Sequence, residues 1–452
     1  MRAEEALTAL NPRVGPVRTG PARRRTELGL IVLVVLLTGW LYAIAGLGKA
    51  GNLPAGLGPF LAIIFVLLIA AHLVVRRLAP LADPILLPVG GLLNGVGYVF
   101  IARLSPHEAR LQAFWTFLGV LVFTGTLLVV RRARDLERFR YTFAFVGIGL
   151  LLLPLVPHIG EDINGARLWV HLGPLNFQPA EIAKLALAIF FASILTDRAD
   201  LLSQPTRRLG RHLVLDPRYL APVVGAWGLS LVIFLAENDI GSSFLFFALF
   251  VGMLWVSTGR WLYLGFGGGL FAAGAYLVLK VFHHAQSRVQ AWLDPWAHAN
   301  TTGYQLIQGW FAVAAGGLFG EGPGQSSAAS IPAASTDMIF AVIADELGLV
   351  GATALLIGYL LIIGTGLRVA IRCERTFEKL LAAGLSLTLG VQTFVIVAGV
   401  TRLIPLTGIT LPFVSYGGSS LIANYILLAL LVRLSHDTEP QALYDMQPQV
   451  TA

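Results

Sequence analysis

The stretch IPAASTDMIFAVIADELGLVG, residues 331–351, changes within a few positions from a polar, turn-forming segment into an apolar run that can enter a membrane. Asp337 lies at this transition, and Asp345 and Glu346 follow about two helical turns later. A carboxylate at membrane depth is costly in free energy, so it indicates a function or an ion pair. Capping of the helix is the simpler role for Asp337, because Ser, Thr and Asp all suit the start of a helix. Residue chemistry alone leaves the capping role slightly ahead of a catalytic one.

The composition of the whole chain indicates an integral membrane protein. Of its 452 residues, 56% are hydrophobic and only 13% are charged, whereas soluble domains carry about 25% charged residues. The single cysteine, Cys373, excludes an internal disulfide and a cysteine-based metal site. The first 27 residues are polar and hold six arginines, so the apolar run after them predicts a first membrane span, not a cleaved signal peptide.

Apolar runs of about 20 residues, the length that crosses a bilayer, recur along the chain. They predict an all-α polytopic membrane protein with about twelve spans, at 29–47, 57–75, 84–102, 112–130, 141–157, 177–197, 219–236, 240–258, 262–280, 338–366, 380–400 and 412–432. If the N-terminus is inside, the inner segments hold 24 of the 32 Lys and Arg residues, as expected for loops that face the cytoplasm. Both termini are therefore expected in the cytoplasm, with a large extracellular loop, residues 281–336, before the tenth span.

This extracellular loop is longer than an ordinary connection between helices, and loops of that length are usually functional or disordered. Aromatic residues, which favour the headgroup level of a membrane, are spread through it, so we expect an interfacial or re-entrant helix within 286–315. The glycine-rich end, GGLFGEGPGQSS at 316–327, lacks the Gly-Lys-Ser/Thr ending of a nucleotide-binding phosphate loop. We expect it to be flexible backbone where the loop re-enters the membrane.

Two pairs of charged residues lie near the outer ends of other spans. Glu181 and Lys184 are three positions apart and therefore share one helix face. They form either a structural ion pair or part of a cavity wall in which the lysine binds an anionic substrate. This stretch of sequence favours neither role over the other. Glu237 and Asp239 lie in the outer turn before the eighth span, where Asn238 or Asp239 can cap the helix.

The last outer loop, TRLIPLTGITLPFVSYGGSS at 401–420, is rich in residues that break helices. Irregular backbone at membrane depth is tolerated only where it lines a cavity or is buried in protein. Substrate contacts are therefore expected in this loop, at Ser415, Gly417, Gly418 and Ser419.

Four stretches resemble the SEDS family, the RodA/FtsW/SpoVE membrane proteins: NGARLWVHLGPLNFQPAEIAKLALAIFF (164–191), GYQLIQGWFAVAAGGLFGEGPGQ (303–325), TDMIFAVIADELGLVG (336–351) and IPLTGITLPFVSYGGSS (404–420). The resemblance runs from about Asp83 to Arg433. It implies a ten-span core at 83–433 that contains the loop 281–336, two extra spans within 29–82, a basic cytoplasmic tail at 1–28 and a second cytoplasmic tail at 434–452. The chain is most similar to a RodA-type protein with a long N-terminus.

The resemblance also implies an activity: a peptidoglycan glycosyltransferase that polymerises lipid II into glycan strands at the outer face of the bacterial plasma membrane, for cell elongation and shape. It implies that Asp337 is catalytic and that Glu181 and Lys184 are the Glu-x-x-Lys pair of the family. The sequence departs from the common Pro-Glu-Ala-His-Thr-Asp motif, because Ala333 and Ser335 replace the glutamate and the histidine. No role is carried over to those two positions.

The expected mechanism is attack of a sugar hydroxyl on a lipid-pyrophosphate sugar, with inversion at C1. Asp337 would be the general base. The departing pyrophosphate needs positive charge, for which the rare outer cations are candidates, with or without a divalent cation (Mg²⁺ or Mn²⁺): Lys184, Arg167 and Arg288.

The partners that the resemblance implies are lipid II, the growing glycan strand, the membrane and a class B penicillin-binding protein that acts as transpeptidase. No nucleic acid and no nucleotide site are expected. The alternative function is a flippase or transporter of lipid-linked cell-wall precursors, because broken helices and buried charges fit transport as well. A weaker alternative is a non-enzymatic scaffold for the transpeptidase.

Overall fold

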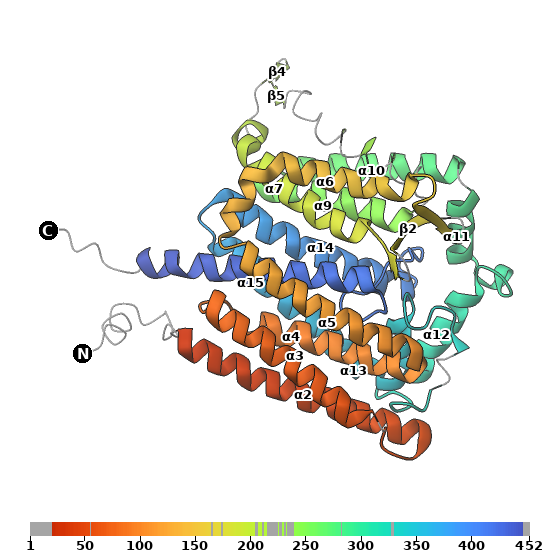
Figure 1. Ribbon diagram of the computed structural model, residues 1–452. Coiled ribbons are helices and arrows are strands. Elements are labelled where there is room, and N and C mark those ends of the chain that lie inside the picture. The colour runs from red at the N-terminus through yellow and green to blue at the C-terminus, as the bar shows by residue number, and fades with distance from the viewer. Residues whose placement is uncertain are drawn as a thin grey trace.

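The computed structural model is a bundle of long helices that run roughly parallel or antiparallel to one another (Figure 1). It describes residues 20–54, 56–163, 166–172, 175–203, 207–209, 212–214, 225, 228–229, 232, 239–281, 283–326 and 330–445. The elements in chain order are α2 (Gly20–Ala50), α3 (Leu57–Leu78), α4 (Leu86–Leu104), α5 (Pro106–Val129), η1 (Ala133–Phe139), α6 (Arg140–Leu152), η2 (Leu153–Leu155), β1 (Gly160–Ile163), β2 (Ala166–Leu172), β3 (Leu175–Phe177), α7 (Ala180–Ser203), β4 (Arg207–Leu209), β5 (His212–Val214), α9 (Ile240–Thr258), α10 (Trp261–Val281), α11 (His283–Leu293), η3 (Trp296–His298), α12 (Tyr304–Gly316), α13 (Ile339–Arg372), α14 (Thr376–Val400) and α15 (Gly418–Asp445).

The predicted spans coincide with these helices. Within the described part of the chain, ten helices are long and apolar enough to cross a membrane. Helix α7 covers an eleventh predicted span, 177–197, and carries the charged pair Glu181 and Lys184. The remaining predicted span, 219–236, lies almost entirely outside the described residues. The prediction of a helical, polytopic membrane protein is therefore confirmed.

Small sheets are the feature of the fold that the all-α prediction missed. Strands β1, β2 and β3 form an antiparallel sheet in the order β1-β2-β3, and β4 pairs with β5. The first sheet occupies the predicted outer loop between α6 and α7, where β2 pairs Val170 with Phe177 of β3. These strands have only three to seven residues, too short to stand out as an alternating pattern beside apolar runs of 20.

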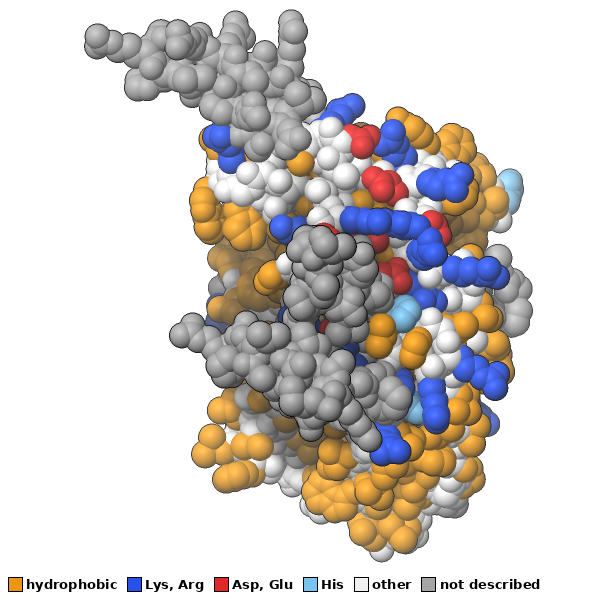
Figure 2. Space-filling view, turned by 90° about the vertical axis from the view of Figure 1, so that its left-hand side faces the viewer, with side chains coloured by type: hydrophobic (Ala, Val, Ile, Leu, Met, Phe, Trp, Pro, Cys, Tyr) orange, Lys and Arg blue, Asp and Glu red, His pale blue; other side chains and the backbone are white. Residues whose placement is uncertain are grey.

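Both described ends of the chain lie at the same end of the bundle. Arg23 of α2 forms an ion pair with Glu439 of α15 at 2.9 Å. The face that carries these ends is rich in arginine and lysine side chains (Figure 2). Exposed basic residues at helix ends on this side include Arg76, Arg77, Arg131, Arg132, Arg372 and Lys379. This arrangement agrees with the charge bias that predicts cytoplasmic termini.

Helices α4, α14 and α15 form the centre of the bundle and are the most buried of the candidate spans. Glycines on α4 allow close packing there: a Cβ on Gly97 would lie 2.4 Å from the carbonyl oxygen of Val414. The loop between α14 and α15 therefore lies directly against a membrane helix. Tyr359 of α13 donates a hydrogen bond to the carbonyl oxygen of Pro412 in the same loop, at 2.6 Å. Irregular backbone is thus buried in protein, as the breaker residues predicted.

Helix α13 is broken near its start. Gly348 has φ 63° and ψ −167°, which is not helical, and a positive φ of this kind suits glycine because other residues are strained there. Residues 339–347 therefore form a short helical segment before the main part of α13. Every residue from Ile339 to Glu346 is buried.

Candidate active site

Asp337 lies in a tight turn immediately before α13. The N–H groups of Thr336 and Met338 both donate to the carbonyl oxygen of Ala333, each at 3.1 Å. The N-cap of α13 is Met338, and no side chain makes a capping hydrogen bond. The simpler role of Asp337, a helix cap, is therefore not supported by the structure.

The loop between α14 and α15 holds this turn in place. Ser415 Oγ donates to the carbonyl oxygen of Thr336 at 2.7 Å, and the Tyr416 N–H donates to the carbonyl oxygen of Ser335 at 2.8 Å. Ser415 in turn accepts from the Leu411 N–H at 2.8 Å and is buried. Ser415 therefore fixes the backbone on the N-terminal side of Asp337.

Arg288 of α11 faces Asp337 across Gly408. A Cβ on Gly408 would lie 3.6 Å from both terminal guanidinium nitrogens of Arg288 and 3.8 Å from Asp337 Oδ2. Gly408 has φ 77°, a backbone conformation that favours glycine. Arg288 is held by the same loop, because its Nη1 donates to the carbonyl oxygen of Thr407 at 2.8 Å.

Burial sets the electrostatics of this pair. It raises the pKa of Asp337 from 3.8 to about 6, while the positive charge of Arg288 and a hydrogen bond from Thr336 oppose the rise and the nearby Asp239 adds to it. Asp337 still keeps a partly exposed side chain. A carboxylate with a pKa of this kind is a stronger base than an ordinary aspartate and remains mostly ionised at neutral pH.

Asp239 is a second carboxylate close to Arg288 and Asp337. Its Oδ1 accepts from the N–H groups of Gly241 and Ser242 at 2.9 and 3.1 Å, which confirms it as the cap of α9. Burial raises its pKa, and the charge of Arg288 opposes that rise. A cap at Asn238 or Asp239 was predictable from the sequence, but the proximity of Asp239 to Asp337 was not, because the two lie about 100 positions apart.

An apolar cavity of about 430 Å³ adjoins Arg288. It is bounded by α9, α10, α11, α14 and the loop after α14, and its walls are almost wholly hydrocarbon, including Phe244, Phe247, Phe271, Val289 and Ile404. Arg288 is the charged residue among those that line it. The cavity therefore suits an apolar chain that ends in an anionic group.

Tryptophans of the long outer loop bind its helices to the end of α14 and the loop after it. Trp292 Nε1 donates to the carbonyl oxygen of Arg402 at 3.0 Å, and Trp310 Nε1 donates to that of Val400 at 3.2 Å. The Arg402 guanidinium lies 4.8 Å from the centre of the Trp310 ring. Helices α11 and α12 occupy the region where a helix was predicted, and α11 carries Arg288.

Glu181 and Lys184 form a buried network behind the loop after α14. Lys184 Nζ lies 2.5 Å from Glu181 Oε2 and donates to Gln392 Oε1 at 2.7 Å. Gln392 Nε2 then donates to the carbonyl oxygen of Thr410 at 2.8 Å. Lys184 is only 1% exposed, so a substrate would have to displace protein groups to meet its ammonium. This placement favours the structural side of the two roles that the sequence left open.

The other predicted substrate contacts lie apart from Asp337 or are buried. Ser419 is buried and accepts a hydrogen bond from the Gln178 N–H at 2.8 Å. A Cβ on Gly418 would lie 2.1 Å from the Trp115 ring, and one on Gly417 would lie 3.3 Å from Thr410 Cγ2. Arg167 lies exposed on strand β2. Of the predicted substrate-binding residues, Arg288 and Ser415 are thus the ones that the structure brings to Asp337.

A metal site finds little support in the geometry. Among the described residues, no group of three or more His, Cys, Asp and Glu side chains could hold a metal ion. Asp239 and Asp337 both lie close to the guanidinium of Arg288, which supplies positive charge at this site.

Comparison with known proteins identifies the family of this polytopic membrane protein. The sequence profile of the FtsW/RodA/SpoVE family, described as cell cycle proteins, matches residues 102–440, and the chain belongs to this family. It is 42% identical over 427 residues to the peptidoglycan glycosyltransferase RodA of Mycobacterium tuberculosis (strain ATCC 25618 / H37Rv), a match that covers 92% of this chain and 91% of that protein.

Two solved structures have the same fold. The rod shape determining protein RodA of Thermus thermophilus is 30% identical with a TM-score of 0.56, over 79% of this chain and 97% of its own. A chain from a peptidoglycan synthase complex, described as coordinating polymerization and crosslinking, is 27% identical with a TM-score of 0.55, over 84% of this chain and 97% of its own. The chain is thus a RodA-type member of the SEDS family.

Proposed function

We propose that this chain is a peptidoglycan glycosyltransferase that polymerises lipid II into glycan strands, with Asp337 as general base. Curated relatives such as the mycobacterial RodA carry the name of that activity. The observation that supports the residue assignment is the position of Asp337, partly buried beside Arg288, next to an apolar cavity. The role in elongation and cell shape rests on the likeness to RodA proteins.

The proposed reaction joins two lipid-linked sugars. The 4-hydroxyl of the acceptor attacks C1 of the donor sugar, and its proton passes to the carboxylate of Asp337. The bond between C1 and the pyrophosphate oxygen breaks, and undecaprenyl pyrophosphate leaves with the electron pair. Attack from the opposite side inverts C1.

Arg288 supplies the positive charge for the leaving group. Guanidinium groups bind phosphate oxygens through two parallel hydrogen bonds, and Arg288 lies both in the wall of the apolar cavity and beside Asp337. A lipid chain in that cavity would place its pyrophosphate at Arg288 and the sugar C1 near Asp337. In this arrangement the donor sugar reaches the site from the membrane on its lipid. Because the lipid pyrophosphate already activates this sugar, the reaction needs no nucleotide.

The site is proposed to face the outside of the bacterial plasma membrane, on the side opposite the basic face of Figure 2. Its proposed partner is a class B penicillin-binding protein, as the likeness to a chain of a peptidoglycan synthase complex supports. The glycines of the loop before Asp337 give its backbone several accessible states, and a partner that binds one of these states would favour it.

A flippase of lipid-linked precursors is the alternative function, because α13 is broken and charged residues are buried within the bundle. The two functions differ in what Asp337 does. A base is needed to form a glycosidic bond, whereas translocation breaks no bond.

The deciding experiment is polymerisation of purified lipid II by the full-length protein, with and without a cognate class B penicillin-binding protein, analysed by gel. Wild type should form long glycan strands, and Asp337→Ala should form none while still folding. Lipid II scrambling in proteoliposomes is measured in parallel. Loss of scrambling with intact polymerisation in Asp337→Ala would refute the proposal in favour of the flippase.

A further inference from the structure

The two N-terminal helices, α2 and α3, lie before residue 102, where the match to the family profile begins, yet α2 touches the segment that holds α13. A Cβ on Gly48 of α2 would lie 2.2 Å from the carbonyl oxygen of Pro323. In the reverse direction, a Cβ on Gly324 would lie 2.2 Å from the carbonyl oxygen of Ala45. The end of α2 and the glycine-rich segment 316–326 are therefore in direct backbone contact.

Polar groups hold the same junction. Lys49 Nζ donates to the carbonyl oxygen of Arg103 at 2.6 Å. The Arg103 guanidinium pairs with Glu346 and donates to the carbonyl oxygen of Ser326, while Glu346 Oε2 accepts from the Gly324 N–H at 2.7 Å. The Arg103 and Glu346 side chains are 7% and 0% exposed. A buried ion pair adds little net stability, but loss of one partner is costly, so the pair favours the observed geometry of the segment over others.

The glycine-rich segment bridges the break in α13. The N–H groups of Glu321 and Gly322 donate to the carbonyl oxygens of Asp345 and Glu346, at 2.9 and 3.1 Å. On the far side of Gly348, the N–H groups at 349 and 350 donate to the carbonyl oxygens at 317 and 318, at 2.9 and 3.1 Å. The segment therefore sets where residues 339–347 end, and Asp337 lies at the other end of this short, buried helix.

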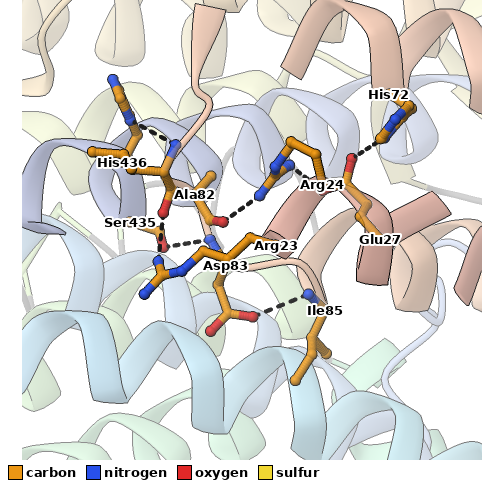
Figure 3. A network of polar contacts seen from close by, with 10 residues as sticks. Arg23, Arg24, Glu27, His72, Ala82, Asp83, Ile85, Ser435 and His436 are labelled. Carbon is orange, nitrogen blue, oxygen red and sulfur yellow. Dashed lines mark hydrogen bonds and ion pairs between the residues drawn. The ribbon is translucent and has the colours of Figure 1, made fainter. Parts of the chain in front are cut away.

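The opposite end of α2 is fixed as well (Figure 3). Arg24 donates to the carbonyl oxygen of Ala82, and Glu27 lies 2.6 Å from His72 Nδ1 of α3. Together with the ion pair between Arg23 and Glu439, these contacts tie α2 to α3 and α15. Helix α2 is thus held at both ends, and the position of its Gly48 end is not free to follow the glycine-rich segment.

We propose that the N-terminal helix pair α2–α3 positions the general base: α2 presses on the glycine-rich segment, which sets the first part of α13 and so the placement of Asp337. Gly48 and Gly324 are the positioning residues of this contact. The proposal rests on the proposed role of Asp337. It assigns to the two helices that precede the family match a part in catalysis beyond membrane anchoring.

The matches with relatives agree with an N-terminal pair that only some members possess. The mycobacterial RodA match covers 92% of this chain, so it extends into α2–α3, which end at Leu78. The Thermus RodA match covers 97% of that chain but only 79% of this one.

The test compares Gly48→Ala with Gly29→Ala in the full-length protein together with its transpeptidase partner. Both glycines lie on α2, but a Cβ on Gly29 would meet nothing within 4 Å, so Gly29→Ala is the matched control. A misplacement of about 1 Å costs on the order of 100-fold in rate. We expect kcat of Gly48→Ala to fall about tenfold or more, with KM for lipid II within about twofold of wild type, because the apolar cavity is built from other helices.

A second readout is the acid limb of the pH–rate profile, since a displaced Asp337 gains water and its pKa falls from about 6. We expect the acid limb of the pH–rate profile to move to lower pH in Gly48→Ala and to remain at the wild-type position in Gly29→Ala. Lys49→Met is the milder variant, used if Gly48→Ala does not fold, and should change kcat and the limb in the same direction.

Two outcomes overturn the positioning role: Gly48→Ala as fast as Gly29→Ala with the same pH limb, or an unfolded Gly48→Ala together with an unchanged Lys49→Met. Asp337→Asn is measured alongside. If it remains active, the assignment of the base fails whatever the Gly48 variants show. If it is inactive and Gly48→Ala is normal, only the positioning role fails.

Discussion

Replacing Asp337 by asparagine should abolish catalysis and at the same time stabilise the protein. Asparagine keeps the shape of the side chain but has no charge and cannot accept the proton. Burial raises the pKa of Asp337 from 3.8 to about 6, so the folded protein binds a proton here more tightly than the unfolded chain between those values. Each pKa unit corresponds to about 1.4 kcal/mol, and two units to about 3 kcal/mol. Because Asp337 is partly exposed, we expect a gain of about 1–3 kcal/mol at pH 7.5.

The size of this effect depends on pH in a defined way. The raised pKa means that ionised Asp337 destabilises the fold above about pH 6, and that this cost disappears as pH falls towards 4. Thermal unfolding in one detergent should therefore show a higher melting temperature for Asp337→Asn than for wild type at pH 7.5, and a difference about one third as large at pH 4.5. Polymerisation of lipid II should be lost at every pH. A folded Asp337→Asn that makes near-normal polymer would refute the general base, and equal stability at pH 7.5 would refute the electrostatic argument.

Four further predictions concern the pH dependence of the reaction, two charged sites and the partner protein. For wild type, kcat/KM should fall about tenfold per pH unit below about 6, since the base must be ionised; a flat profile from pH 4.5 to 8 would contradict this. Arg288→Ala should raise KM for lipid II about tenfold or more. Arg288→Lys should raise it less, because lysine keeps the positive charge although it lacks the bidentate donors; unchanged kinetics would remove Arg288 from the site. If the Glu181–Lys184 pair is structural, the charge-swapped variant Glu181→Lys with Lys184→Glu should keep much of its activity. A variant that is stable and inserted in the membrane but inactive would instead favour substrate contact. A class B penicillin-binding protein with a dead transpeptidase site should still stimulate polymerisation, and an isolated chain as fast as the complex would show that no partner is needed for activation.

The membrane architecture was predictable because one physical constraint dominates it. A helix that crosses hydrocarbon must be apolar over a fixed length, and this constraint acts on each span separately. The predicted span 338–366 and the observed helix α13, Ile339–Arg372, differ chiefly at the inner end. There the helix continues into water, where hydropathy gives no signal, so its end depends on local hydrogen bonds.

The break in α13 could not be predicted, because its partner lies elsewhere in the sequence. Gly348 follows a glutamate and a leucine inside an apolar run that favours helix. The helix is interrupted because backbone groups at 345–350 find hydrogen-bond partners at 317–322. A broken helix needs such partners, and the glycine-rich composition of 316–326 was the one sequence signal that pointed to them. The proximity of Arg288 and Asp239 to Asp337 was unpredictable for the same reason. These residues lie far apart in the sequence, and the folding of the loops brings them together.

The placement of Asp337 at a junction of loops, and not within a membrane helix, follows from what a general base needs. A carboxylate in full contact with water has a pKa near 4 and is a weak base, whereas one sealed in hydrocarbon is neutral at pH 7 and cannot accept a proton. Partial burial beside Arg288 gives a pKa of about 6, so about nine in ten molecules are ionised at pH 7 while basicity rises about 100-fold. Such a balance requires fixed surroundings, since a small shift toward water or hydrocarbon would change the pKa by a unit or more. The hydrogen bonds from Ser415 and Tyr416 to the turn before Asp337 provide that fixation. Loss of the Ser415 hydroxyl should therefore alter the pH dependence of the reaction before it alters the binding of lipid II.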